Sequence, residues 1–316
     1  MRTTIIVFIS MIVTSGLAQE NDGATAAIEG LKKFDKVRDF TMSQSGNEAY
    51  YTLQSPTEEV SVICTSIKKN GDWSTPKITS FSGKYKDLEA FLTQDGLRLY
   101  FVSNRPLNDS IPGQKDFDIW YVERANLIEE WSEPVNMGNP INTEHNEFYP
   151  ALSKNGNLYF TSDNPKGKGR DDIFFSAFKN GGFTDPISLG EHINSEGFEY
   201  NAYISHDESY LLFGGYNRED GLGSGDIYIS FNEGKGNWSQ AKPLPKPINS
   251  AQMDYCPFVD EENNTIYFTS RRVTLPNSRF DEFTTFETYI NSYENGNSRL
   301  YKTDFQIEEL RKKIQE

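Results

Sequence analysis

Short runs of apolar and aromatic residues alternate with polar turns along most of the chain. A representative run is Leu158-Tyr159-Phe160-Thr161-Ser162, which follows the turn residues 153–156 and precedes a second run at 172–176. Runs of this length, rich in aromatic and β-branched residues and separated by Gly, Asn and Asp, are typical of strands joined by tight turns. The pattern therefore predicts an all-β protein.

The same order of runs and turns recurs five times. Its equivalent apolar anchors are spaced 50, 60, 52 and 55 residues apart, and they are Met42, Leu92, Leu152, Ile204 and Val259. Each copy holds four strand-like segments, and a sheet of that size cannot bury both of its faces alone. Radial stacking of neighbouring sheets solves this problem, so residues 36–304 are predicted to form a five-bladed β-propeller with four-stranded blades.

Two features of the fifth copy concern how the ring closes. This copy has no Trp-x-x-Pro segment, so either residues 24–35 supply the fourth strand or the last blade has three strands. After residue 304, Ile307, Leu310 and Ile314 share one helical face, and Glu308 and Lys312 form a favourable i, i+4 pair. Residues 305–316 are therefore predicted to form a short C-terminal helical tail.

The first 18 residues predict export. Arg2 precedes an apolar run, and small residues end the segment at Ala18, which is the pattern of a cleaved signal peptide. Gln19 would then be the first mature residue, and a bacterial lipoprotein has Cys there, so no lipid anchor is expected. Residues 19–35 form an N-terminal segment, and no other segment is apolar enough to span a membrane. The expected location is the periplasm or the extracellular medium.

Charge narrows the range of partners. Without the leader the chain has 30 basic and 46 acidic residues. A surface this acidic disfavours nucleic acid and anionic lipid, because phosphate contacts need clustered Lys and Arg. Proteins, glycans and cations stay open as partners. Cys64 and Cys256 fall at different depths of different blades, so they are predicted not to form a disulfide.

The repeat resembles the PD40, or WD40-like, repeat of the TolB family. The resemblance rests on the Pro-x-Leu-Ser-x-x-Gly turn at 150–156, the Leu-Tyr-Phe-x-Ser strand at 158–162 and the Asp-Ile-Tyr strand start at 226–228. It implies a non-catalytic module of the bacterial envelope that binds a protein or a glycan. The stretch Pro140-Ile141-Asn142-Thr143 is similar to the version found in propellers fused to OmpA-like proteins, but no OmpA-like domain follows residue 304, so a direct peptidoglycan role is not expected.

Four carboxylates occupy equivalent positions at the starts of first strands. They are Asp87, Glu147, Glu199 and Asp254. One interpretation is a partial ring at the channel mouth that binds a cation or a basic ligand. The alternative, favoured by their recurrence, is that each bonds backbone amides and joins neighbouring blades. The same argument predicts that Asp118, Asp172 and Asp226 cap the loops before the third strands.

The blade 5 loop between strands two and three is much longer than the others. It runs over 272–298, and its candidate binding residues, with one at its start, are Arg271, Arg272, Phe280, Phe283, Phe286 and Tyr289. Long aromatic loops on a rigid scaffold often bind partners. The alternative is a flap that covers an incomplete blade.

Catalytic and metal motifs are lacking in the sequence. The three histidines have no metal-ligand spacing, and no Gly-x-Ser-x-Gly nucleophile elbow occurs, so no metal, cofactor or catalytic residue is predicted. The expected function is a monomeric, non-catalytic propeller that binds an envelope protein or a glycan. The alternative is a glycoside-acting enzyme that uses Glu147 and Glu199 as its paired carboxylates.

Overall fold

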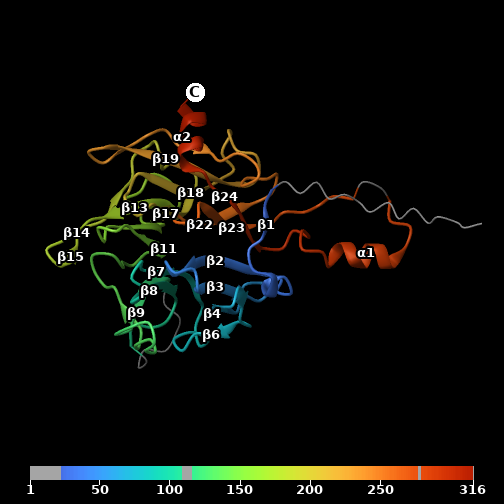
Figure 1. The fold of residues 1–316 in the computed structure, drawn as a ribbon. Helices are drawn as coiled ribbons and strands as arrows, with labels where there is room; N and C mark the ends of the chain where they lie inside the picture. The colour runs from blue at the N-terminus through green and yellow to red at the C-terminus, as the bar shows by residue number, and fades with distance from the viewer. Residues whose placement is uncertain (1–22, 109–115, 277–278, 316) are drawn as a thin grey trace, which may run out of the picture.

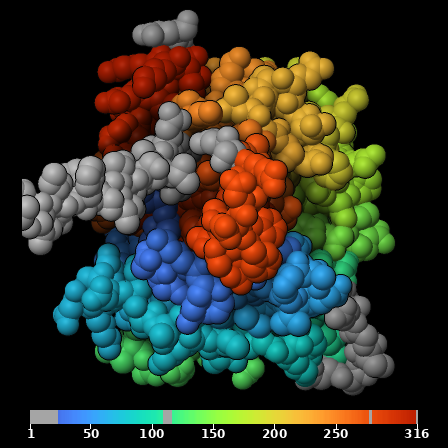
Figure 2. Space-filling model, turned by 90° about the vertical axis from the view of Figure 1, so that its right-hand side faces the viewer, coloured from blue at the N-terminus to red at the C-terminus, as the bar shows by residue number. Residues whose placement is uncertain are grey.

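Five antiparallel sheets stand around a common axis, as a computed structural model of the chain shows (Figure 1). The structure describes residues 23–108, 116–276 and 279–315, so the predicted signal peptide lies outside the described residues. The prediction of an all-β, five-bladed propeller with four-stranded blades is confirmed. Figure 2 looks onto one end of the ring.

Within each blade the first strand lies nearest the axis, and the other three strands follow it outward in order. The first strands of blades 1 to 5 are β2 (Val37–Met42), β7 (Asp87–Leu92), β11 (Glu147–Leu152), β17 (Glu199–Ile204) and β22 (Asp254–Asp260). The second strands are β3 (Glu48–Gln54), β8 (Arg98–Ser103), β12 (Leu158–Ser162), β18 (Tyr210–Tyr216) and β23 (Thr265–Ser270). The third strands are β4 (Ser61–Lys69), β9 (Asp118–Glu123), β13 (Asp172–Ser176), β19 (Gly225–Gly234) and β24 (Arg299–Asp304).

The outermost strands are short. They are β6 (Lys77–Ile78), β10 (Val135–Asn136), β16 (Ile187–Ser188), β21 (Lys242–Pro243) and, in blade 5, β1 (Thr25–Ala26). Small extra strands extend the outer edges, namely β5 (Asp72–Trp73), β14 (Phe178–Lys179), β15 (Gly182–Phe183) and β20 (Asn237–Trp238).

The N-terminal segment closes the ring. Strand β1 pairs antiparallel with β24, with Thr25 opposite Lys302 and Ala26 opposite Tyr301, and the Ala27 amide donates to the Leu300 carbonyl at 3.0 Å. A 3-10 turn, η1 (Glu29–Leu31), then leads into blade 1. Of the two alternatives for blade 5, the one with a fourth strand from the N-terminal segment is confirmed.

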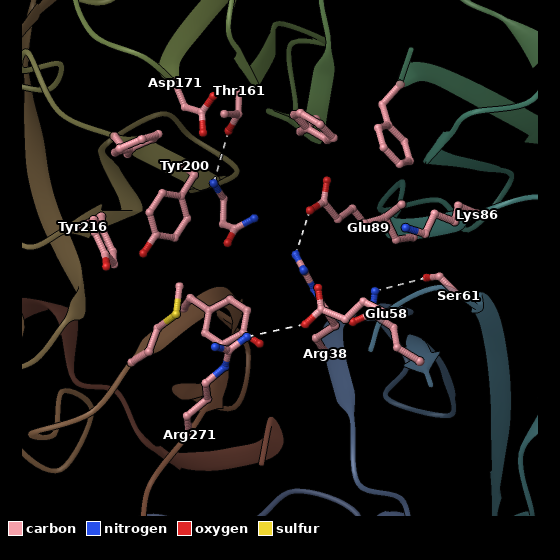
Figure 3. A pocket seen from close by; sticks show the side chains of 18 residues that line it. Arg38, Glu58, Ser61, Lys86, Glu89, Thr161, Asp171, Tyr200, Tyr216 and Arg271 are labelled. Carbon is pink, nitrogen blue, oxygen red and sulfur yellow. Dashed lines mark hydrogen bonds and ion pairs between the residues drawn. The ribbon is translucent and has the colours of Figure 1, made fainter. Parts of the chain in front are cut away.

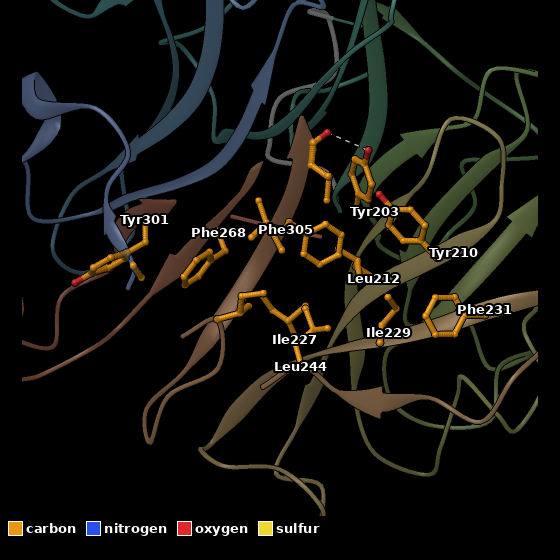
Figure 4. Close-up of a cluster of buried hydrophobic side chains, with 14 residues drawn as sticks. Tyr203, Tyr210, Leu212, Ile227, Ile229, Phe231, Leu244, Phe268, Tyr301 and Phe305 are labelled. Atoms are coloured by element: carbon orange, nitrogen blue, oxygen red, sulfur yellow. Dashed lines mark hydrogen bonds between the residues drawn. The ribbon is translucent and has the colours of Figure 1, made fainter. Parts of the chain in front are cut away.

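Among the described residues, five apolar clusters fill the interfaces between neighbouring blades, and a smaller sixth cluster of Tyr149, Tyr255 and Cys256 lies near the axis. Figure 4 shows the cluster between blades 4 and 5, in which Leu212, Ile227 and Ile229 of blade 4 face Phe268 and Tyr301 of blade 5. Helix α2 (Ile307–Gln315) packs its apolar side chains, including Leu310, onto this cluster. The predicted C-terminal helix is confirmed.

Every first strand contains a bulge at its third residue. The pairing of each first strand with its neighbour shifts register there. The five residues at the bulges have φ between 47° and 59°, and they are Asp39, Glu89, Tyr149, Asn201 and Cys256. Residues other than glycine rarely adopt this left-handed conformation, and its strain is often held at functional sites. We call these five residues the axial ring.

Both cysteines are free and buried. Cys64 lies in the third strand of blade 1, whereas Cys256 belongs to the axial ring. The prediction that they form no disulfide is confirmed.

Candidate functional site

The four predicted mouth carboxylates are buried and hydrogen-bonded within the protein. Glu199 accepts from the Ser195 amide and hydroxyl, both at 2.7 Å, and Asp254 accepts from the Ser250 amide at 2.6 Å and hydroxyl at 2.7 Å. Glu147 accepts from the Thr143 hydroxyl at 2.7 Å. Asp87 accepts from the Ser82 hydroxyl at 2.8 Å and the Gly83 amide at 3.3 Å. These partners lie on the loops that join neighbouring blades, as the blade-joining interpretation expects.

Three of these carboxylates also face an arginine from the end of the second strand. The distances from guanidinium nitrogen to carboxylate oxygen are 2.6 Å for Arg105 and Asp87, 2.7 Å for Arg218 and Glu199, and 3.6 Å for Arg272 and Asp254. Each arginine also donates to a carbonyl of the preceding inter-blade loop, as Arg218 does to Ile193. We call each such pair an arginine clip. The predicted binding residue Arg272 is thus an internal contact of blade 5.

Two of the other recurring aspartates, Asp172 and Asp226, cap the loops before the third strands as predicted. Asp226 accepts from the amides of Leu222 and Gly223, both at 3.0 Å, and Asp172 accepts from the Gly169 amide at 3.1 Å. Asp118 accepts from the Asn136 side chain at 2.8 Å.

A pocket of about 520 Å³ opens at the channel mouth (Figure 3). Its walls come from all five blades, and the aromatic members are Phe117, Phe148, Phe198, Tyr200, Tyr216 and Tyr255. The charged members are Arg38, Glu58, Lys86, Glu89, Asp171 and Arg271. We call this cavity the mouth pocket. It is open and combines aromatic rings with converging charged and polar side chains, which makes it a candidate ligand site.

A network of charges forms the floor of the mouth pocket. Arg38 donates to Asp39 at 2.7 Å and to Glu89 at 2.8 Å, and the Cys256 thiol donates to Asp39 at 2.9 Å. The second oxygen of Glu89 accepts from the Tyr149 amide at 2.8 Å. The Cys256 sulfur also lies 3.4 Å from the Asn201 side-chain oxygen, so this network connects all five blades beneath the pocket.

Two carboxyl groups of the mouth pocket have raised pKa values. Burial raises the pKa of Asp171 to about 6, and the charges of Asp163, Asp172 and Glu199 act in the same direction. Burial also raises the pKa of Glu89, although Arg38 opposes this shift. Asp171 adds to the shift of Glu89, so the two carboxyl groups are within electrostatic reach of each other.

The long loop of blade 5 forms an arm that projects from the mouth face. The Val273–Asn295 bridge ties its base, and helix α1 (Phe283–Ile290) lies near its tip. Figure 1 shows α1 standing off the blades, and Figure 2 shows the arm in front of the ring. No residue of α1 is buried, and Phe283 is 72% exposed. Since β1 already completes blade 5, the arm does not replace a missing strand.

The predicted arm aromatics cluster with one another. Phe280 lies 5.4 Å from Phe286 and 5.2 Å from Tyr289, ring centre to ring centre, and Phe283 lies 6.2 Å from Phe286. Arg271, at the base of the arm, lines the mouth pocket, whereas none of these four rings does. That the arm binds a partner stays a prediction.

The sequence did not reveal the pocket residues Arg38, Glu89 and Asp171. Equivalent positions hold different residue types in each blade, so the repeat gives no signal there. Asp172 recurs as Asp118 and Asp226 in the neighbouring blades, whereas Asp171 does not recur. The repeat therefore indicated Asp172 and not its neighbour Asp171. Within residues 23–108, 116–276 and 279–315, no cluster of His, Cys, Asp and Glu has the geometry of a metal site. No helix of this part of the chain is long and apolar enough to cross a membrane.

Comparison with known proteins supports the fold alone. No family model matches the chain, and no curated protein matches it. Among solved structures, it is similar to a glycoside hydrolase, with a TM-score of 0.55, 9% identity and 90% of each chain covered. It is also similar to an α-L-arabinofuranosidase of Fusarium graminearum solved with arabinobiose, with a TM-score of 0.50, 10% identity and coverage of 84% of this chain and 73% of that one.

TolB from Acinetobacter baumannii is a further structural neighbour. Its TM-score is 0.44 and its identity 14%, with 86% of this chain covered, and the chain spans 55% of that TolB's length. The architecture and the stronger of these likenesses define the class of the protein, which is a five-bladed β-propeller.

Proposed function

We propose that this chain is an exported, non-catalytic β-propeller that binds an envelope protein or a glycan at its mouth. The observation that carries the proposal is the mouth pocket itself, an open cavity of about 520 Å³ with aromatic walls from four blades. Aromatic side chains held on a rigid scaffold contribute much of the binding energy at recognition sites. Export to the periplasm or beyond follows from the predicted signal peptide and belongs to the same proposal.

The carboxylates at the first-strand starts do not line this pocket. Their partners are internal, so we propose that Asp87, Glu147, Glu199 and Asp254 hold the mouth in shape rather than contact the ligand. The ligand contacts come instead from residues such as Tyr216 and Arg271, which are about half exposed on its rim.

A binding screen with matched variants tests the proposal. The mature protein is probed with an oligosaccharide panel and with fractionated envelope extract, beside a Tyr216→Ala, Arg271→Ala double variant. The control is Ile128→Ser, because Ile128 is 94% exposed on the opposite face of the ring. We expect the double variant to lose at least about tenfold in affinity for any ligand found, and the control to bind normally. Equal binding by all three proteins would contradict a mouth site.

A second candidate function is glycoside hydrolysis, because Glu89 and Asp171 share the mouth pocket and both have raised pKa values. Such enzymes pair an acid of raised pKa with a second carboxylate. Against it, Glu89 is bonded to Arg38 and to the Tyr149 amide. Release of nitrophenol from aryl glycosides, abolished by both Asp171→Asn and Glu89→Gln, would establish hydrolysis.

A further inference from the structure

One wall of the mouth pocket gathers aromatic rings around a single carboxyl group. Asp171 forms a backbone bridge with Phe198, and the rings of Phe198 and Tyr216 lie 6.0 Å apart, edge to face. Figure 3 shows Asp171, Tyr200 and Tyr216 on one side of the pocket and Lys86 on the other. We call Asp171, Phe198, Tyr200 and Tyr216 the Asp171 subsite.

The Asp171 carboxyl has no partner of its own within the described ranges, and its acidic neighbours do. Asp163 accepts from the Asn146 amide at 2.8 Å, Asp172 accepts from backbone amides, and Glu199 pairs with Arg218. The buried Tyr200 hydroxyl of the same subsite also lacks a hydrogen-bond partner among the described residues. The subsite therefore holds two polar groups that internal contacts do not satisfy.

Two of the three basic side chains that line the mouth pocket, Arg38 and Arg271, are paired elsewhere, and the third, Lys86, lies across the pocket from Asp171 (Figure 3). Arg38 bonds Asp39 and Glu89, and Arg271 lies 3.6 Å from Glu58. Arg170, next to Asp171 in the chain, lies over the Phe198 ring at 5.4 Å. The neighbouring charges that shift the pKa of Asp171 are those of Asp163, Asp172 and Glu199, and all three raise it.

We propose that the Asp171 subsite binds a lysine side chain of a polypeptide partner. The faces of aromatic rings attract a cation, and a carboxylate among them adds a direct charge pair. The inference rests on the proposed function, because it names the chemistry that the mouth pocket recognises. A lysine ammonium suits the subsite because it is a compact charge on an apolar stem, which can lie along the rings.

Features of the mouth rim favour a polypeptide over a glycan as the source of this cation. Four of the loops between second and third strands each expose an apolar side chain beside the mouth, and these are Val60, Leu107, Leu222 and Leu275. The arm adds the exposed Phe283 on the same side. A polypeptide partner can bury these apolar side chains with apolar side chains of its own, which a polar glycan lacks. The net charge of −15 also draws basic partners.

Binding should depend on pH in a defined direction. The groups that face Asp171 are the carboxylates Asp163, Asp172, Glu199 and Glu89, with Arg218 and Arg38 bonded to the last two. The ionised form of Asp171 attracts a cation and the protonated form does not, and its pKa is about 6; Glu89, with a pKa raised to about 7, ionises over an overlapping range but is paired with Arg38. Affinity for lysine should therefore rise as the pH increases from about 5 to about 7.5, and Asp171→Asn should remove most of this rise, leaving only what the Arg38-paired Glu89 contributes.

The test uses the mature chain and two matched peptides, acetyl-Gly-Lys-Gly-amide and the same peptide with Nε-acetyl-lysine, titrated by NMR at pH 5 and pH 7.5. The variants are Asp171→Asn, Tyr216→Ala and the conservative Tyr216→Phe. Glu219→Gln serves as the control for lost charge, since Glu219 is exposed on the mouth face outside the pocket lining. Neutral cello-oligosaccharides form a separate arm.

We expect the lysine peptide to bind at least about tenfold more tightly than its acetylated counterpart at pH 7.5. Asp171→Asn and Tyr216→Ala should remove this preference, whereas Tyr216→Phe and Glu219→Gln should keep it. Equal dissociation constants for the two peptides, or no peptide binding at the highest soluble concentration, would overturn the proposal. If cello-oligosaccharides bind at the pocket and the lysine peptide does not, the lysine proposal fails while the mouth-binding function stands.

Discussion

The Asp171 carboxyl at the channel mouth is raised in pKa, and this lowers the stability of the folded chain at neutral pH. The pKa of Asp171 in the folded chain, about 6, lies above the value of about 3.9 expected when the chain is unfolded. Between these values the folded chain holds more protons than the unfolded chain. This group therefore lowers the free energy of unfolding as the pH rises from about 4 to about 6.

Replacing that carboxyl should stabilise the protein. We expect Asp171→Asn to raise the free energy of unfolding at pH 7 by about 1 kcal/mol, after allowance for solvent screening of a group that is partly exposed. The gain should vanish near pH 3.5, where the carboxyl is protonated in both states. Urea unfolding at the two pH values measures it, and a loss of stability at pH 7 would contradict the assigned direction. Gained stability with lost binding is a frequent trade-off at functional sites.

For the arginine clips we expect the opposite effect, because replacing an arginine should lower the free energy of unfolding. Arg218→Ala leaves Glu199 buried without its countercharge, so we expect a loss of roughly 3 to 5 kcal/mol in the free energy of unfolding. Arg98→Ala, which breaks the exposed pair with Glu123, is the control and should cost less than about 1 kcal/mol. Chemical denaturation of both variants makes the comparison, and similar losses would show that the clip is not a buried structural pair.

At the scale of elements, the arm is the part whose role the packing does not explain. Helix α1 has eight residues and buries none, which is marginal for a helix in water. Replacing Phe283, Phe286 and Tyr289 with Ser should leave the melting temperature nearly unchanged, because the ring pairs that these side chains form among the described residues lie within the arm. The same change should weaken partner binding. A large drop in melting temperature would mean that the arm covers apolar sheet.

The repeat predicted the strands but not the site between them. Apolar anchors such as Leu152 and Ile204 recur because every inter-blade cluster needs them, so their spacing is visible in one sequence. The axial ring has no such signature, since Asp39, Tyr149 and Cys256 share a backbone conformation and not a chemical type. Helix α1 was also missed, because a short exposed helix lacks a buried face to impose a period.

For the whole molecule, the decisive contact is the one that closes the ring. Ala27→Pro removes the amide that donates to Leu300 and should weaken the seam between β1 and β24. We expect a loss of about 2 to 4 kcal/mol in the free energy of unfolding, together with faster proteolysis within blade 5. Gly30→Pro, in the neighbouring η1, serves as a comparison, because a Cβ at Gly30 would meet no atom within 4 Å. It should leave the pairing of β1 with β24 intact. Proteolysis spread evenly over all blades would contradict a local seam.

The pairing of β1 with β24 also determines when the propeller can complete its folding. Thr25 and Lys302 lie 277 residues apart, so the first strand to be synthesised waits for the last. Four blades can assemble from local hairpins, but the fifth remains open at its edge until almost the whole chain is present. Contacts this distant in sequence slow folding, and unpaired edges invite wrong partners in the meantime. A chain interrupted before residue 299 would therefore present an open ring, and its survival would depend on how quickly that edge is covered.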